Sequence, residues 1–476
     1  MAQPPAPRPP APHPPTLPTP RTPEPSPAGE AATAGGRPAR RKALLIGLVL
    51  ALLLGAGGWA LWSFTGGGSP GGGKQTADGK NPAPGSVAWK AEARTAPDQK
   101  FTKAMGTWFT SSLVVKAEPD MVTAYDIKTG RKKWSFILTG RLCAASRESE
   151  GDVVVVAAMF GKSCIDLKAI DLRDGHRLWN ELLVEEREAD DHLNPDKWGK
   201  AEPRLSLNAG HVYMTWAEGS QTRRLSDGKR VAQEKHAPCE WSDAAGGDRL
   251  IAVDYCGTRD ITVRSLDPAN LAKPRWTTTL PRNDGFVSII STSPLVLTQS
   301  PGKGGPDDRY DFVVLDPAGG REKTRIAYNG YWRLGPCFLS TSGCTGALTD
   351  KNSLYVAGQG VTMAYDLSTG RPRWTYKADA NRVTIPVAVH DGQVAAYTTA
   401  TPQRPGRTTF VSASDGKARR TVEHSDRETD RKNEAMMAKV TGFPRLRDDR
   451  LLLVNDGNVP DRSGVVLAVA VPGGSG

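Results

Sequence analysis

Short apolar runs bounded by turn residues recur along most of the chain after about residue 86. Runs at 153–158 (VVVVAA), 250–253 (LIAV) and 354–357 (LYVA) are built mainly from β-branched and other apolar residues. Runs of this length, separated by Gly, Asp and Asn, are typical of strands. The pattern therefore predicts an all-β domain over residues 86–472.

The strand pattern repeats about every 45–50 residues. Three segments share the pattern A-[YI]-D-[IL]-x-[TD]-G-x-x-x-W, and weaker copies occur near 225–228, 265–267, 314–320 and 412–416. The Asp, Gly and Trp of the three close copies are Asp126, Gly130 and Trp134; Asp171, Gly175 and Trp179; and Asp366, Gly370 and Trp374. A repeat of this length has room for four strands, as in one blade of a β-propeller.

The repeated residues have structural explanations. The Asp carboxylate accepts hydrogen bonds from amides of the following turn, and Gly adopts a positive φ there. The Trp that follows is expected in the outgoing strand, wedged between neighbouring sheets. We therefore interpret these residues as blade-building residues rather than catalytic ones.

The two ends of the domain each carry half of a repeat. Trp89 has no D-x-x-T-G segment before it, and the apolar tail at 464–471 has no D-G-W turn after it. Joining the two would complete a blade and remove an open sheet edge. With that blade we count eight copies, and a seven-bladed propeller is the alternative.

The D-x-x-T-G-x-x-x-W repeat resembles that of the PQQ-binding-like (quinoprotein alcohol dehydrogenase-like) propeller family, over about residues 86–472. That family includes the Gram-negative outer-membrane assembly propeller lipoprotein. Its enzymes hold pyrroloquinoline quinone and calcium in the ring centre, against a disulfide between adjacent cysteines. This chain has no adjacent cysteines and no C-x-x-C-H haem motif. The resemblance thus implies a bacterial propeller without a cofactor, with a divergent quinoprotein oxidoreductase as the alternative.

An uncharged segment at residues 43–64 is long enough to cross a bilayer as a helix. Arg37, Arg40, Arg41 and Lys42 precede it, and Trp59, Trp62 and Phe64 mark its far end. Basic residues stay cytoplasmic, so this pattern predicts a single-pass anchor with the propeller outside the membrane. A cleaved signal peptide is the alternative, but about 40 residues precede the apolar run, longer than a usual signal peptide allows.

Two low-complexity segments flank the predicted anchor. Residues 1–42 hold 14 prolines up to position 38 and predict a disordered cytoplasmic tail, with an SH3-type ligand or phosphorylation target as the alternative. Residues 65–85 are Gly-rich and predict a flexible linker.

Six cysteines in a domain outside the membrane predict disulfides rather than metal ligands. Their positions favour Cys143 with Cys164, Cys239 with Cys256, and Cys337 with Cys344. In blade topology all six fall on one face, together with insertions near 184–202, 300–309, 328–344, 400–408 and 423–443. We expect this face to meet a partner, because binding residues concentrate on long loops. The alternative is that these loops have diverged in sequence and bind no partner.

Catalytic and metal-binding patterns are not found in the sequence. The seven histidines are scattered, without an H-E-x-x-H motif, and an acidic run at 185–191 is interpreted as a solvated loop rather than a cation site. The net charge of +11 is too diffuse to predict nucleic-acid binding.

We therefore predict a monomeric, non-enzymatic, membrane-anchored propeller outside the cytoplasm. It would bind an extracytoplasmic protein or sense a ligand at the insertion-rich face. Binding of anionic cell-wall polymer is a further alternative.

Overall fold

The computed structural model describes residues 81–92, 101–184, 193–194, 203–235, 239, 241–256, 260–281, 287–299, 310–328, 345–439, 442–460 and 464–473. The predicted tail (1–42), the predicted anchor (43–64) and most of the predicted linker (65–85) lie outside these residues. Among the described residues, no helix has the length and apolar character needed to cross a membrane.

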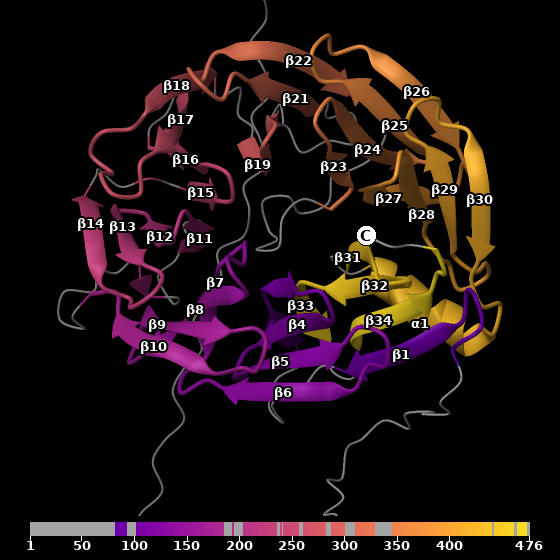
Figure 1. The fold of residues 1–476 in the computed structure, drawn as a ribbon, viewed down its shortest axis with the longest axis horizontal. Coiled ribbons are helices and arrows are strands. Elements are labelled where there is room, and N and C mark those ends of the chain that lie inside the picture. The colour runs from indigo at the N-terminus through magenta and orange to yellow at the C-terminus, as the bar shows by residue number, and fades with distance from the viewer. Residues whose placement is uncertain are drawn as a thin grey trace, which may run out of the picture. The chain divides into compact units, whose positions relative to one another are not determined.

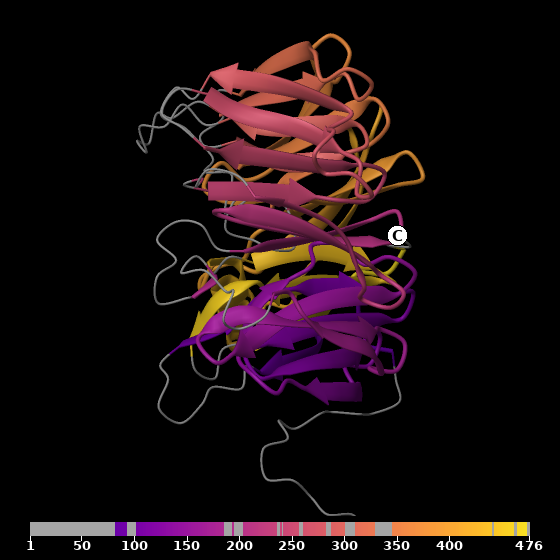
Figure 2. The ribbon, with the colours of Figure 1, turned by 90° about the vertical axis from the view of Figure 1, so that its left-hand side faces the viewer.

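The described part of the chain folds into small antiparallel sheets that follow one another around a ring (Figure 1). It contains six four-stranded sheets, one eight-stranded sheet and one two-stranded ribbon. Seen edge-on, the strands run across the thickness of the ring (Figure 2). The all-β propeller predicted from the repeat is thus the observed fold class.

Five of these four-stranded sheets use consecutive strands. The first two contain β3 (Thr107–Phe109), β4 (Leu113–Glu118), β5 (Met121–Asp126) and β6 (Lys132–Ile137), then β7 (Leu142–Ala145), β8 (Val153–Phe160), β9 (Ser163–Asp171) and β10 (Arg177–Leu182). The third and fourth contain β11 (Arg204–Asn208), β12 (His211–Trp216), β13 (Gly219–Arg224) and β14 (Arg230–Lys235), then β15 (Trp241–Ala245), β16 (Leu250–Tyr255), β17 (Asp260–Leu266) and β18 (Trp276–Pro281). The fifth contains β19 (Val287–Thr292), β20 (Leu295–Gln299), β21 (Tyr310–Leu315) and β22 (Glu322–Tyr328).

The eight-stranded sheet consists of two consecutive four-strand sets. The first set is β23 (Ala347–Thr349), β24 (Ser353–Gln359), β25 (Val361–Asp366) and β26 (Pro372–Lys377). The second is β27 (Val383–His390), β28 (Gln393–Thr398), β29 (Arg407–Ser412) and β30 (Ala418–Glu423). The sets join where β24 pairs with β27, over the two residue pairs Gly358–Thr384 and Gln359–Val383.

The remaining four-stranded sheet combines both ends of the domain. It contains β31 (Gly442–Arg447), β32 (Arg450–Asn455), β34 (Gly464–Ala470) and, outermost, β1 (Val87–Glu92). β1 and β34 are antiparallel, with Trp89 opposite Ala468, and the indigo β1 lies beside the yellow β34 (Figure 1). This is the closure expected from Trp89 and the apolar tail.

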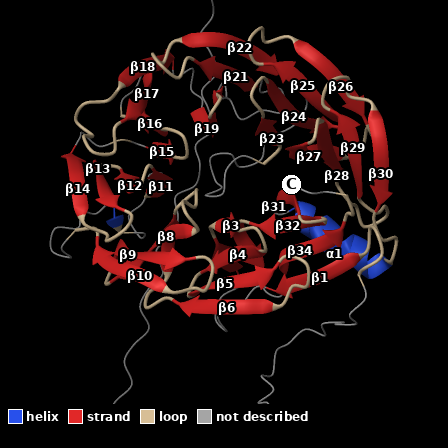
Figure 3. Ribbon diagram, in the orientation of Figure 1, coloured by secondary structure: helices blue, strands red, loops and turns tan. Residues whose placement is uncertain are grey.

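Two further elements lie outside the sheets just described. β2 (Phe101–Ala104) and β33 (Gly457–Pro460) form the two-stranded ribbon. The helix α1 (Glu428–Lys439) follows β30 and packs against β32 and β34 (Figure 3).

The apolar core lies mainly between neighbouring sheets. One cluster joins the β7–β10 and β11–β14 sheets through Val155, Leu167, Leu207 and Met214, all at most 1% exposed. Because each sheet is covered on both faces, its strands carry long buried runs, as the all-buried β9 does. The ring is therefore a scaffold whose connections are left to carry function.

Candidate functional site: the insertion face

The repeated Trp and Gly residues join neighbouring sheets. Trp134 Nε1 donates a hydrogen bond to Leu172 O at 3.1 Å, and Trp374 Nε1 donates to Ala413 O at 2.8 Å. Gly175, at φ +78°, lies against the Trp134 ring, where a Cβ would come within 2.5 Å of Cε3. Each Trp thus fixes its sheet to the turn of the next sheet, which is a structural role.

The repeated Asp residues hold those turns. Asp126 Oδ1 accepts hydrogen bonds from the amide and the hydroxyl of Thr129, both at 2.9 Å. Burial raises the pKa of Asp126, but the hydrogen bonds from Thr129 and Lys133 outweigh it and lower the pKa. Hydrogen bonds from Ser368 and Arg373 likewise hold the pKa of Asp366 far below its usual range. The hydrogen bonds of the turn therefore favour the ionised form of these carboxylates.

The sheet topology gives the ring two different faces. One face carries the turns between first and second strands and between third and fourth strands, including the turns that hold the repeated Asp and Gly. The other face, which we call the insertion face, carries the second-to-third connections and the links between sheets. The helix α1 links β30 to β31, and the β2–β33 ribbon uses one such link and one such connection. Both elements therefore belong to the insertion face.

Two disulfides lie at the insertion face within the described residues. Cys143 pairs with Cys164 across 21 residues, and Cys239 pairs with Cys256 across 17 residues, as favoured from the sequence. Cys143 near the start of β7 is joined to Cys164 near the start of β9, and Cys239 just before β15 is joined to Cys256 just after β16. Cys337 and Cys344 lie outside the described residues, so their pairing stays a prediction.

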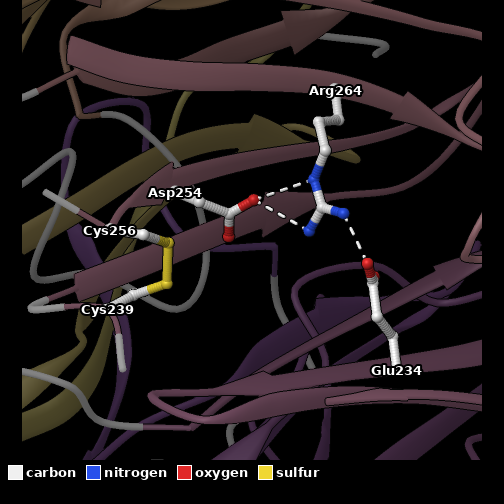
Figure 4. The surroundings of a disulfide bond; sticks show 5 residues. All are labelled: Glu234, Cys239, Asp254, Cys256 and Arg264. Atoms are coloured by element: carbon white, nitrogen blue, oxygen red, sulfur yellow. Dashed lines mark hydrogen bonds and ion pairs between the residues drawn. A yellow bond between two sulfur atoms is a disulfide. The ribbon is translucent and has the colours of Figure 1, made fainter. Parts of the chain in front are cut away.

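A charged clamp lies beside the Cys239–Cys256 disulfide (Figure 4). Arg264 contacts Asp254 Oδ2 through Nε at 3.0 Å and Nη2 at 2.9 Å, and Nη1 contacts Glu234 Oε2 at 3.1 Å. Burial lowers the pKa of Arg264, but the attraction of Asp254 and Glu234 outweighs it and raises the pKa. Since Glu234 is on β14 and Arg264 on β17, the clamp ties two sheets together.

The helix α1 is anchored by a buried polar network. Glu434 Oε1 accepts a hydrogen bond from Tyr397 Oη at 2.8 Å and lies 2.9 Å from His424 Nδ1. His424 Nε2 lies 3.0 Å from Thr408 Oγ1. A hydroxyl, an imidazole and a carboxylate in this order resemble a nucleophile, base and orienting acid. All are buried, however, so the network can fix α1 to the ring but offers no surface to a substrate.

The β2–β33 ribbon is fixed by a buried ion pair. Lys116 Nζ lies 2.8 Å from Asp456 Oδ1, with side chains at most 1% exposed. Lys116 also donates to Gly106 O at 3.2 Å and Thr107 Oγ1 at 3.0 Å. Asp456 directly precedes β33, so the pair fixes the base of the ribbon to β4. Removing one partner of such a pair strongly destabilises a protein, because the other charge stays buried without compensation.

Polar groups near the ring axis join several sheets. Glu148 accepts hydrogen bonds from Leu207 N at 3.1 Å and Gly246 N at 2.8 Å, while Arg147 Nη2 donates to Ile289 O at 2.8 Å. Burial raises the pKa of Glu148, and Arg147 opposes that rise. The β7–β8 connection thus reaches the third, fourth and fifth sheets, which stiffens the scaffold.

The described residues hold no candidate metal site, and several predicted insertions lie outside them. Within the described ranges, no group of three or more His, Cys, Asp and Glu side chains could hold a metal ion. The acidic run at 185–191, the insertion near 300–309, all but residue 328 of the insertion near 328–344, and most of the insertion near 184–202 lie outside those ranges. Residues 428–434 of the mixed-charge segment 426–434 form the first part of α1.

Several site residues could not be found from the sequence. Tyr397 and Glu434 are 37 residues apart, and Lys116 and Asp456 are 340 apart. Isolated polar residues inside apolar strands, such as Lys116 in LVVKAE, are the signal that could have raised the question.

Three solved structures illustrate the fold likeness. BamB from Moraxella catarrhalis is 13% identical, covering 80% of this chain and all of that chain, with a TM-score of 0.44. The dihydro-heme d1 dehydrogenase NirN is 12% identical, covering 79% and 76%, with a TM-score of 0.44. The C-terminal WD40 domain of Sif2 is 10% identical, covering 81% and 99%, with a TM-score of 0.46.

The comparison of sequences is more informative for the family. No curated protein sequence matches the chain. The profile of a family described as "Outer membrane protein assembly factor BamB" matches residues 74–197 and 311–469, which together are more than half of the chain. The repeat, the propeller fold and this match agree, and the chain belongs to the BamB-like family of PQQ-type β-propellers.

Proposed function

We propose that this chain is a non-enzymatic protein-interaction module: an eight-bladed propeller, monomeric and held outside the cytoplasm by a membrane anchor, that binds a partner protein at its insertion face. The count takes the two sets of the eight-stranded sheet as separate blades. This agrees with their single short junction at β24 and β27.

The observation that carries the proposal is how the insertion face is built. Its helix is fixed by Glu434, its ribbon by Asp456, and two of its connections by disulfides. Fixed elements lose little conformational entropy when a partner binds, which favours affinity. Long connections that served no purpose would not need such anchoring.

Two features support the proposed compartment and the absence of catalysis. Disulfides persist in oxidising compartments, which agrees with a propeller outside the cytoplasm. The arrangement of Thr408, His424 and Glu434 that most resembles a catalytic set is buried beneath α1.

The outer side of α1 is the part of the insertion face best suited to a test. Glu428, Lys432 and Met436 are exposed at intervals of four residues and so share one side of the helix. Glu434 and Met437, in contrast, are buried against the ring. A probe at Lys432 therefore reports on what approaches the insertion face.

The test is site-specific photo-crosslinking of the full-length protein in the cells that make it. A photoreactive residue at Lys432 should give a discrete adduct with one protein. The matched control is the same residue at Lys417, whose side chain is 77% exposed in the turn between β29 and β30 on the opposite face. Adducts of equal yield at both positions, or at Lys417 alone, would contradict the assignment of the partner to the insertion face.

A further inference from the structure

The interface between the β11–β14 and β15–β18 sheets differs from a usual apolar interface. Along β12, Val212, Met214 and Trp216 pack toward the β7–β10 sheet, within one apolar cluster. Tyr213, on the other side of the strand, packs toward the fourth sheet with Ala244 and Ala252. We call this second interface the polar seam.

Buried polar side chains collect in the polar seam. On the third sheet, Ser206 is paired with Tyr213, and Thr215 is paired with Ser220. On the fourth sheet, Ser242 is paired with Asp254. None of the six side chains is more than 3% exposed: Ser206, Tyr213, Thr215, Ser220, Ser242 and Asp254.

Each of these side chains has one oxygen that forms no hydrogen bond within 3.5 Å in the described part of the protein. The atoms are Ser206 Oγ, Tyr213 Oη, Thr215 Oγ1, Ser220 Oγ, Ser242 Oγ and Asp254 Oδ1. Tyr213, Thr215 and Ser220 are close neighbours on the third sheet, since hydrogen-bonding contacts of Tyr213 with Ser220 and Thr215 oppose the rise that burial causes in the pKa of Tyr213. A buried polar atom that lacks a partner is costly, and six in one interface call for a common partner.

The polar seam is closed on two sides. At the insertion face, Cys239 N donates a hydrogen bond to Ala217 O at 2.8 Å, and the disulfide holds Cys239 to Cys256. At the outer rim, Arg264 bridges Asp254 and Glu234 (Figure 4). These contacts hold the third and fourth sheets together on two sides of the polar seam.

The chemistry of the seam favours water over a cation. Hydroxyl groups both donate and accept hydrogen bonds, and a buried water molecule makes two to four of them. Asp254 is the only carboxylate among the six, and its other oxygen already contacts the Arg264 guanidinium. That positive charge would repel a cation at the same carboxylate.

We propose that the polar seam is an internal hydration site, in which a cluster of ordered water molecules bridges the third and fourth sheets through the hydroxyls of Ser206, Tyr213, Thr215, Ser220 and Ser242 and through Asp254 Oδ1. The seam lies wholly within residues 198–310, the segment between the two stretches that match the family profile. This site is independent of the proposed partner binding.

Hydroxyl deletions in the full-length protein test the proposal. Tyr213→Phe and Thr215→Val should each lower the thermal unfolding midpoint by about 1–3 °C, because bonds to water are lost. Thr222→Val is the matched control, since the Thr222 hydroxyl donates to Pro268 O at 2.6 Å in the same seam. The fall in its midpoint measures the loss of one hydrogen bond to a protein group. A midpoint raised by both seam variants, with Thr222→Val lowered, would show a dry interface and overturn the proposal.

A second experiment separates water from a cation. Calcium chloride added to the full-length protein should leave the midpoint unchanged relative to sodium chloride of equal ionic strength. A calcium-dependent rise that Asp254→Asn abolishes would show a cation site and overturn the water assignment. A crystal structure should show density within hydrogen-bond distance of Tyr213 Oη and Thr215 Oγ1, and an interface without such density would also overturn it.

Discussion

Strand β12 sends alternate side chains to two neighbouring sheets, and the two interfaces differ in chemistry. Met214 and Trp216 enter an apolar cluster with the β7–β10 sheet, while Tyr213 and Thr215 enter the polar seam with the β15–β18 sheet. Both sides are equally buried. In a propeller, period-two alternation therefore distinguishes one neighbour from the other rather than the core from the solvent.

The comparison also separates two sources of cohesion between sheets. The apolar interface gains stability from area removed from water, in proportion to the side chains that fill it. The polar seam has a smaller apolar cluster around Tyr213, and the clamp of Arg264 and the Cys239–Cys256 disulfide also connect its two sides. The two interfaces should therefore respond to different substitutions.

The largest effect is expected on the apolar side. Met214→Ala should lower the free energy of unfolding by about 2–5 kcal/mol, because Met214 is 1% exposed and truncation leaves a cavity. Guanidinium unfolding of the full-length protein measures the loss. Met436→Ala on α1, where the side chain is 47% exposed, is the control and should change stability by less than about 0.5 kcal/mol. Equal losses of stability in the two variants would contradict the expected difference between a buried interface residue and an exposed one.

Loss of a disulfide should have an effect of intermediate size on stability. The two disulfides span 21 and 17 residues, so the loss of either should cost about 3 kcal/mol through chain entropy. Cys143 and Cys164 also belong to the apolar cluster, whereas Cys239 and Cys256 close the polar seam.

Paired replacement by serine should therefore be more costly for Cys143 and Cys164, where two hydroxyls enter an apolar cluster. Unfolding curves of the two double variants, with paired alanine replacements as controls, give the difference. A larger loss for the Cys239 and Cys256 pair would reverse the expected order.

The smallest effect on stability is expected in the turns that hold the repeated Asp, which recur in several sheets of the ring. The folded pKa of Asp366 is lowered below 3.8, so its carboxylate stabilises the fold at neutral pH. That contribution is lost as the pH falls from about 5 toward about 2. Asp366→Asn should therefore make the unfolding midpoint less dependent on pH in this range.

Ser368→Ala serves as its control, because it removes a hydrogen bond to Asp366 and keeps the carboxylate. Ser368→Ala should partly reduce the dependence of the unfolding midpoint on pH in this range. An unchanged slope in both variants would show that the turn carboxylate carries no pH-dependent stability.

The sequence predicted the role of residues that recur in the repeats and hold the same turn or the same contact between neighbouring sheets. Trp134 and Asp126 recur at fixed spacing because each blade needs the same turn and the same wedge, so the propeller and its closure at Trp89 followed from the pattern. The pairings Cys143–Cys164 and Cys239–Cys256 followed from the same topology.

The polar seam and the anchors of the insertion face did not follow from the sequence. HVYMTW reads as an ordinary strand, and which neighbour Tyr213 meets depends on the twist and packing of whole sheets. The contacts of Glu434 with Tyr397 and of Lys116 with Asp456 join residues far apart in the chain. Such partners are fixed only when the ring closes.

The strand that closes the ring has a consequence for synthesis. β34 supplies an inner strand of the last sheet, yet it is made after every other strand, and β1 must wait for it as an unpaired edge. During translation the earlier blades can form in order, but the nascent ring stays open. The chain therefore needs protection of β1 until residue 470 is made, which places the risk of aggregation at the end of synthesis.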